Sequence, residues 1–340
     1  MSDLVIEAVD PHDAVAVDGF HRVYLAAELA TGPGIASPWM RDEVRVMLQE
    51  RGRRAVDAFV ARAGKRVVAA GFVAMPLWDN LDSADLAVYV APEDRRRGHG
   101  STLLAAVEED VRGRGRTLVN AEATWAYDRG PDGAGEAGPE FARACGYALG
   151  LSDVKRRLAL PVDDALLDAL AEEAAPHHAA YTLRSWVGPV PDDLAEGWVR
   201  LTSTLMTEAP TGELEREPET AEVALLRAGE AMTAKQGRTK YNTVALDTIG
   251  DVVAYTDIAT TVHEPGKAYQ WGTLVRKDAR GHRLGLAVKV ANHRLLQRER
   301  SDLRELTTYN AEVNRHMVAV NERLGFVPVA RLGEFQKRLA

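Results

Sequence analysis

The chain has 340 residues, a length that favours two domains, and its 46% apolar content is ample for buried cores. Its formal net charge of −8 argues against a nucleic-acid partner, because affinity for a phosphate backbone comes from clustered Lys and Arg. The single cysteine, Cys145, excludes an internal disulfide and a cysteine-based metal cluster, and it favours a reducing, cytoplasmic location.

The first half of the chain has the pattern of strands around one long amphipathic helix. Apolar residues recur at helical spacing after a Gly-rich turn, whereas the other apolar runs alternate or are rich in β-formers. The expected strands span residues 4–9, 55–63, 65–75, 85–90, 117–123 and 149–160. The expected helices span residues 101–114 and 140–145, and a Gly-rich loop is expected over residues 127–140.

The second half repeats this order after an Ala-, Asp- and Glu-rich segment, residues 161–178, which we expect to be a helical linker. The expected strands of this half span residues 181–186, 239–247, 251–259, 269–275, 302–309 and 326–331. The expected helices span residues 191–206, 284–298 and 311–324.

Landmarks in the two halves recur at a near-constant offset. Arg95 and Arg280 lie 185 residues apart, and each follows a strand and precedes a long helix. Gly146 and Gly325 end equivalent short helices 179 residues apart. Shared order at a near-constant offset predicts two copies of one fold. The expected domains are residues 1–160 and 179–340.

The turn RRRGHGS, residues 95–101, concentrates positive charge and glycine in an acidic chain. The first N–H groups of a helix have no partners within it, and the helix dipole adds partial positive charge there. Glycine lets a phosphate approach the backbone closely, and arginine adds forked donors. The turn is therefore a candidate cradle for a pyrophosphate, and a solvated basic loop with ordinary turn glycines is the alternative.

The segment Val88–Gly100 resembles the acetyl-CoA signature of the GNAT superfamily of N-acetyltransferases, in which Arg/Gln-x-x-Gly-x-Gly/Ala follows a strand. Gly146-Tyr147 resembles the closing Gly-Phe of that family. The second half repeats the resemblance in Arg280–Gly285, in Asn314, and in the closing Gly325-Phe326. The resemblance covers almost the whole chain, and it is to the tandem, two-domain type of this family.

The resemblance implies an α/β fold of two tandem GNAT-like domains, each a mixed, splayed central sheet flanked by helices. It also implies transfer of an acetyl group from acetyl-CoA to a primary amine by direct attack, without a metal. The pantetheine arm would lie in the splay and the pyrophosphate on the turn amides. The implied cosubstrate-binding residues are Val88, Val90, Arg95, Arg96, Arg97, Gly98, His99, Gly100, Ser101, Thr273, Val275, Arg280, Gly281, His282, Arg283, Leu284, Gly285 and Asn314.

The two halves depart from the family pattern in opposite ways. In the first half the turn is intact, but Gly135 stands where the family has an Asn and Ala142 where it often has a Tyr acid. In the second half the later motif fits, but Arg283 replaces the first turn glycine, which is acceptable if its φ is negative. Asn321 takes the Tyr position there. This asymmetry favours the second half as the catalytic one.

Tyr309, at the end of the splayed strand, is the best local candidate for the acid that meets the departing thiolate. Asp257 is the candidate base, acting through a water, and Asn321 is a third candidate by its position. Core packing is the alternative for Tyr309, and a solvated strand position is the alternative for Asp257. In the first half the matching carboxylates are Asp85 and Glu122.

Three alternatives stay open at this point: a non-catalytic acyl-CoA-binding or sensing protein, catalysis in the first half, and a protein-interaction module with inactive sites. We expect a small-molecule amine as acceptor and a monomer or homodimer. The N-terminal MSDLVIEAVD lacks the features of a secretory signal, and no stretch approaches the roughly 18 apolar residues of a membrane span. We therefore expect no membrane partner.

Overall fold

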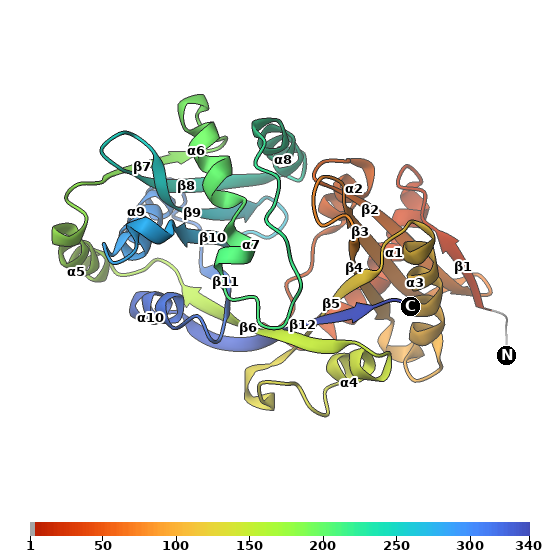
Figure 1. The fold of residues 1–340 in the computed structure, drawn as a ribbon. Coiled ribbons are helices and arrows are strands. Elements are labelled where there is room, and N and C mark those ends of the chain that lie inside the picture. Colours follow the sequence, from red (N-terminus) through yellow and green to blue (C-terminus); the bar gives the residue numbers. More distant parts are fainter. Residues whose placement is uncertain (1–3) are drawn as a thin grey trace. The chain divides into compact units, whose positions relative to one another are not determined.

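The computed structural model describes residues 4–340, which form two compact units (Figure 1). The first unit contains the chain up to Ser152, together with Gly212–Glu215 and Ala330–Ala340. The second unit contains Asp153–Thr211 and Arg216–Val329. Within residues 4–340, no helix combines the length and the apolar character needed to cross a membrane.

The first unit is a mixed sheet with helices on both faces, and its strand order is β1-β2-β3-β4-β5-β12. The β4–β5 pair is parallel, and the other neighbours are antiparallel. The strands are β1 Leu4–Ala8, β2 Arg54–Ala63, β3 Arg66–Pro76, β4 Ser83–Val90, β5 Leu118–Ala126 and β12 Val327–Arg338. The helices are α1 Ala14–Leu29, α2 Arg41–Gln49, α3 His99–Gly113 and α4 Ala137–Ala144, with short 3₁₀ turns at Pro92–Asp94 and Tyr127–Arg129.

Two apolar clusters cover the two faces of this sheet. On one face, α1 buries Val17, Phe20 and Val23 against the sheet. On the other face, α3 buries a stripe with the spacing that the sequence predicted, which places the start of α3 directly after the glycine-rich turn. The residues of that stripe are Leu103, Leu104, Val107 and Val111.

The second unit repeats this arrangement, with the strand order β6-β11-β10-β9-β8-β7. Here the β10–β11 pair is parallel, and the other neighbours are antiparallel. The strands are β6 Ala148–Ala159, β7 Thr182–Val187, β8 Arg238–Leu246, β9 Val252–Thr261, β10 Lys267–Val275 and β11 Glu305–Ala311. The helices are α5 Asp164–Ala174, α6 Asp192–Thr202, α7 Leu205–Glu208, α8 Val223–Lys235, α9 Leu284–Glu299 and α10 Arg315–Leu324, with 3₁₀ turns at Ala175–His177 and Lys277–Ala279.

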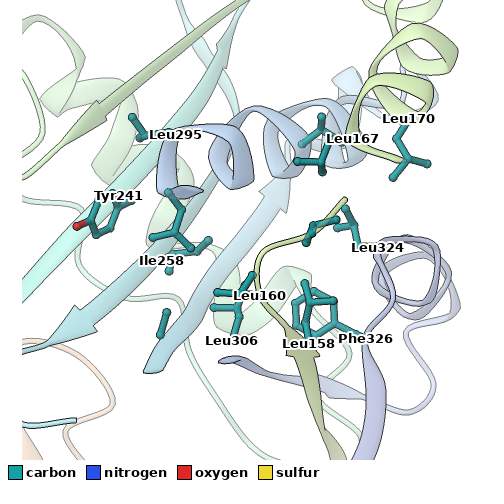
Figure 2. Close-up of a cluster of buried hydrophobic side chains, with 14 of the residues drawn as sticks. Leu158, Leu160, Leu167, Leu170, Tyr241, Ile258, Leu295, Leu306, Leu324 and Phe326 are labelled. Atoms are coloured by element: carbon teal, nitrogen blue, oxygen red, sulfur yellow. The ribbon is translucent and has the colours of Figure 1, made fainter. Parts of the chain in front are cut away.

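The segment expected to be a linker, residues 161–178, is a packed part of the second unit. Its helix α5 buries Leu167, Leu170 and Ala174 in the largest apolar cluster of that unit. Figure 2 shows Leu167 and Leu170 pointing from α5 toward this cluster. The three residues share one helical face, so burial of that face ties the segment to the unit instead of leaving it as a connection.

The two halves of the sequence exchange their last strands. In the first unit, β12 pairs with β5 from Ala330↔Ala126 to Arg338↔Leu118, so the end of the chain completes the sheet of its beginning (Figure 1). In the second unit, β6 pairs with β11 from Asp153↔Ala311 to Ala159↔Glu305. The compact units therefore differ from the expected domains 1–160 and 179–340. A strand's alternation shows which face is buried, but it does not name the neighbouring strand.

Other differences are local. The sequence analysis missed α1, α2 and α8, and the expected helix over residues 191–206 is broken into α6 and α7. The helix expected from residue 311 begins at Arg315, because Asn314 caps it. The final strand runs to Arg338, not to residue 331, because it pairs along the whole of β5.

Candidate active site

Each sheet opens at its parallel pair. In the first unit, β4 and β5 pair over Ser83–Asp85, and the rest of β4 up to Val90 diverges from β5. In the second unit, β10 and β11 pair over Lys267–Tyr269, and the rest of β10 up to Val275 diverges. Backbone groups along such an open edge can pair with an extended ligand. Val88, Val90, Thr273 and Val275 lie on these two edges.

The first turn presents an uncapped helix start. Gly98 has φ 85° and is the N-cap of α3, where it has no side chain to occupy the amides that follow. A Cβ built on Gly98 would enter open space. The exposed Arg95 turns its side chain back onto the backbone: its Nε donates to Val90 O at 3.3 Å and its Nη2 to Ala27 O at 3.3 Å. Arg95 therefore fixes the turn to the end of β4.

The remaining cations of the first turn are near its surface. Arg97 donates to Glu93 O at 3.0 Å and lies 3.5 Å from the buried Asp94 carboxylate, which is already held by Arg66 at 2.7 Å. Arg96 is exposed and forms no ion pair within residues 4–340. His99 and Ser101 begin α3 beside it. Arg96 and the amides of this helix start are thus available to an anion.

The second turn has the same backbone path. Nε of Arg280 donates to Val275 O at 3.2 Å, the counterpart of the Arg95 contact. Arg283 is the N-cap of α9 and has φ 52°, so the condition of a negative φ for a residue other than glycine is not met. A left-handed residue other than glycine costs about 1–2 kcal/mol. The Arg283 side chain forms an ion pair with Glu173 in which both partners are partly exposed.

Carboxylates form ion pairs with the cations of the second turn. Glu173 of α5 pairs with both Arg283 and Arg323. Glu208 of α7 pairs with Arg280 at 3.0 Å and with Lys277 at 2.9 Å. The sequence analysis missed both glutamates, because ion-pair partners so distant in the chain leave no local pattern.

The two turns also differ in their histidines. Nδ1 of His282 lies 3.2 Å from His177 O, at the end of the segment that follows α5. The ring of His282 lies against Tyr181, with 5.3 Å between ring centroids. His282 is thus held by neighbouring residues, whereas His99 is a half-buried residue at the helix start.

A bulge distinguishes the two open strands. The register of β10 against β9 shifts between Gln270 and Gly272, so Trp271 is the extra residue. In contrast, β4 keeps a regular register with β3 along Asp85–Val90. A Cβ on Gly272 would lie 2.5 Å from Tyr255 Oη and 3.0 Å from an Asp257 oxygen, so only glycine fits there. The bulge re-aims the backbone at the point where the sheet opens.

Asp257 is buried beneath this bulge, with 4% of its surface exposed. One carboxylate oxygen accepts from Gly272 N–H at 2.8 Å, and the other lies 2.5 Å from Lys240 Nζ. Burial, and secondarily the Asp257 charge, raises the pKa of Tyr255 well above its usual range. The expected alternative for Asp257, a solvated strand position, is wrong, and its two oxygens are engaged by protein groups.

Tyr309 lies half-buried on β11, two residues beyond Thr307, the last residue that β11 pairs with β10. Asp257 and Tyr309 thus stand on the two strands that flank the bulge. Asn321 is fully buried in α10 and donates to Asn310 Oδ1. Asn314 accepts from Met317 N–H at 3.2 Å as the cap of α10. The two asparagines therefore support the loop between β11 and α10.

An aromatic and cationic group that the sequence analysis missed surrounds the bulge. Lys240 Nζ lies 5.5 Å from the ring centre of Trp198 and 5.4 Å from that of Trp271. Trp271 is 42% exposed, so one side of its ring faces the solvent. The run of aromatic residues around positions 269–271 was the available signal. This group gives the open end of the second unit a wall with π-faces.

The candidate carboxylates of the first half are less suited to act as a base. Asp85 pairs with Arg54 and accepts a hydrogen bond from Asn120 at 2.9 Å, and Glu122 is exposed on β5 opposite Glu334.

Two other kinds of site receive no support. Burial raises the pKa of the Cys145 thiol, which disfavours the reactive thiolate. Among residues 4–340, no group of three His, Cys, Asp or Glu side chains is arranged to hold a metal ion.

Comparison with known proteins adds the following. The acetyltransferase (GNAT) family model matches residues 20–128. Over 99% of its length, the chain is similar to 98% of a tandem GNAT protein from the clavulanic acid biosynthesis pathway, with 30% identity and a TM-score of 0.80. No curated protein matches the chain significantly.

More distant solved structures share the fold. A GCN5-related N-acetyltransferase from Sphaerobacter thermophilus has 20% identity and a TM-score of 0.63, over 98% of this chain and 95% of that one. An N-myristoyltransferase from Saccharomyces cerevisiae has 11% identity and a TM-score of 0.57, over 99% and 80% of the two chains. At these identities the likeness concerns the fold alone.

Proposed function

The chain belongs to the GNAT acetyltransferase family in its tandem form, and from this premise we propose that its second unit transfers the acetyl group of acetyl-CoA to a primary amine of a small molecule. The expected fold, two tandem GNAT-like α/β domains, is confirmed, and the protein is an acyltransferase. One observation carries the choice of the second unit: the bulge of β10 at the opening of the sheet, flanked by Asp257 and Tyr309.

The chain offers acetyl-CoA a fitting site in each unit. The open space in front of Gly98 suits a pyrophosphate on the first amides of α3. In the second unit the corresponding amides begin α9, and Thr273 and Val275 lie on the open edge for an extended pantetheine arm. Acetyl-CoA supplies the thioester carbonyl that the amine attacks, and the residues at the bulge orient that carbonyl.

Tyr309 is the proposed acid for the departing thiolate, because it lies in the opening next to the bulge. Asp257 fits a different role from the expected base. Its ion pair with Lys240 and its hydrogen bond from Gly272 favour holding the bulge in place. Asn321, fully buried in α10, supports the loop after β11 and lacks access to a substrate.

Two variants, one in each turn, test which unit carries the chemistry. Gly98→Glu and Gly285→Glu each place a carboxylate in front of one turn, where it repels and displaces a phosphate. Turnover is measured as release of free thiol from acetyl-CoA with a panel of primary amines. We expect Gly285→Glu to lose turnover by about 100-fold and Gly98→Glu to keep most of it.

The opposite result would move the chemistry to the first unit. Binding of acetyl-CoA without turnover on any amine would instead support the non-catalytic acyl-CoA-binding protein, which the absence of a Tyr at Ala142 and Asn321 favours. Gly98→Glu strains a position with φ 85°, so its folding is checked by thermal unfolding before turnover is compared.

A further inference from the structure

An amine lies buried below the bulge of the second unit. Lys289 of α9 is 1% exposed, and its Nζ donates to Gln270 Oε1 at 3.2 Å. Within the described chain no carboxylate pairs with it. The ring of Phe326 lies 5.7 Å from Nζ, and His293, one turn along α9, is fully buried. Burial lowers the pKa of Lys289 to about 7. Burial of an amine that has one hydrogen bond and no paired carboxylate lowers the free energy of unfolding.

Lys289 is connected to the bulge through Gln270. The Nε2 of Gln270 donates to Asp257 O at 2.8 Å and to Thr256 Oγ1 at 2.8 Å. Thr256 Oγ1 lies 3.1 Å from Gly272 O. The bulge is thus held from the α9 side by this relay, and from the other side by the Asp257 carboxylate on Gly272 N–H.

The first unit provides an internal comparison. At the offset of 185 residues, Lys289 corresponds to Leu104, which is 5% exposed in α3. Gln270 precedes the extra residue of the bulge and therefore corresponds in register to Leu86, because Ile258 and Val73 are the equivalent partners on the neighbouring strands. The strand there keeps a regular register. The same fold therefore accepts a leucine at this helix position when its strand has no bulge, so the lysine is not needed for the fold itself.

We propose that Lys289 is a positioning residue for acetyl transfer in the second unit, acting through Gln270 to fix the bulge backbone that orients the thioester carbonyl. This inference rests on the proposed function of the second unit. It assigns the buried amine to the geometry of the site and not to contact with the substrate.

Lys289→Leu gives the second unit the residue of the first. We expect kcat to fall about tenfold while KM for acetyl-CoA stays within about twofold, because the turn and the strand edge are untouched. We also expect Tm to rise by a few degrees, because an unpaired buried amine is removed. A merely structural lysine would not give lower turnover together with higher stability. Leu104→Met in the first unit is the matched control, with kcat unchanged.

An unchanged kcat in Lys289→Leu would overturn the inference. If that variant fails to fold, Gln270→Met interrupts the relay at its other end, and the same loss of kcat is expected; unchanged kcat there overturns the inference equally. Gly285→Glu separates the two levels. If it keeps full turnover, the proposed function of the second unit fails and the inference with it. If it loses turnover while Lys289→Leu and Gln270→Met keep theirs, the inference alone fails.

Discussion

The two turns share one arginine contact and differ at the N-cap of the following helix. Arg95 and Arg280 make the same bond, from Nε to the carbonyl of the residue that ends the open strand, at 3.3 and 3.2 Å. This arginine therefore anchors the turn to the open strand. From the motif alone, we expected it to bind phosphate. At the N-cap the units differ, with Gly98 in one and Arg283 in the other. The first unit keeps the more open anion site, and the second has the bulge.

Tyr309→Phe tests the proposed acid. Removal of the hydroxyl leaves the thiolate without a proton donor, so we expect kcat with acetyl-CoA to fall by about 100-fold, with KM little changed. A thioester whose thiol is strongly acidic needs no such donor, and its turnover is expected to be nearly unaffected. Steady-state kinetics with both thioesters measure the difference.

The control for this test is Tyr147→Phe in the first unit. The hydroxyl of Tyr147 donates to Glu108 Oε1 at 2.8 Å, so turnover in the second unit should persist. An equal loss with both thioesters in Tyr309→Phe would show that Tyr309 packs the site and does not donate a proton.

At the residue scale, the sequence predicted the positions of the turns and of their glycines, because their chemistry is local. It did not predict that Glu173 and Glu208 form ion pairs with the second turn, since their partners lie far along the chain. The burial of Asp257 and its pairing with Lys240 were equally hidden, because alternation along a strand does not reveal which face a helix covers.

At the scale of elements, the helices α5 and α7 determine how much of the positive charge of the second turn is already paired. Glu173 of α5 and Glu208 of α7 place carboxylates on Arg283 and Arg280, next to the proposed phosphate site at the start of α9. A carboxylate already bound to an arginine competes with an incoming anion. The two units therefore differ in their expected affinity for acetyl-CoA.

Calorimetric titration with acetyl-CoA should resolve a tighter site in the first unit and a weaker one in the second. The double variant Glu173→Gln, Glu208→Gln removes the competing carboxylates, and we expect it to tighten the weaker site by about tenfold. Glu172→Gln with Glu196→Gln changes the net charge equally at exposed positions and should leave both sites unchanged. Equal tightening by the two double variants would attribute the effect to net charge.

Most elements were predicted because their signals are local. In the hairpins around Gly64 and Gly250 and in the helices after both turns, the apolar residues have a regular spacing and glycines mark the ends of the segments. Helices α1, α2 and α8 were missed. The buried faces of α1 and α2 include the polar residues His21 and Glu43, and Leu225 is the one buried residue of α8. Helix α5 was placed but given the wrong role, because the burial of Leu167 and Leu170 depends on partners from other segments.

At the scale of the whole molecule, the repeat was visible in the sequence and the strand exchange was not. The offset of landmarks predicted two copies of one fold, and both units have that fold. The exchange depends on which strand β12 joins. Its pairing with β5 over Ala330–Arg338 joins segments that are far apart in the sequence, so no local pattern predicts it.

A chain that ends at Val329 tests the exchange. It lacks the strand that pairs with all of β5, and it loses Phe335, which is fully buried in the first unit. We expect the first unit to unfold and its acetyl-CoA site to be lost, measured by thermal unfolding and calorimetry. A chain that ends at Leu339 keeps the strand and should behave as the full protein. If the first unit survives in the shorter chain, β12 is dispensable for it.

The exchanged strand also sets an order of events during synthesis. The ribosome makes β5 long before it makes β12, the strand that covers the edge of β5. Until β12 has emerged, the first sheet presents an unpaired edge, the kind of surface on which nascent chains associate with one another. A chain released before β12 is made would therefore have an incomplete sheet in the part that was synthesised first.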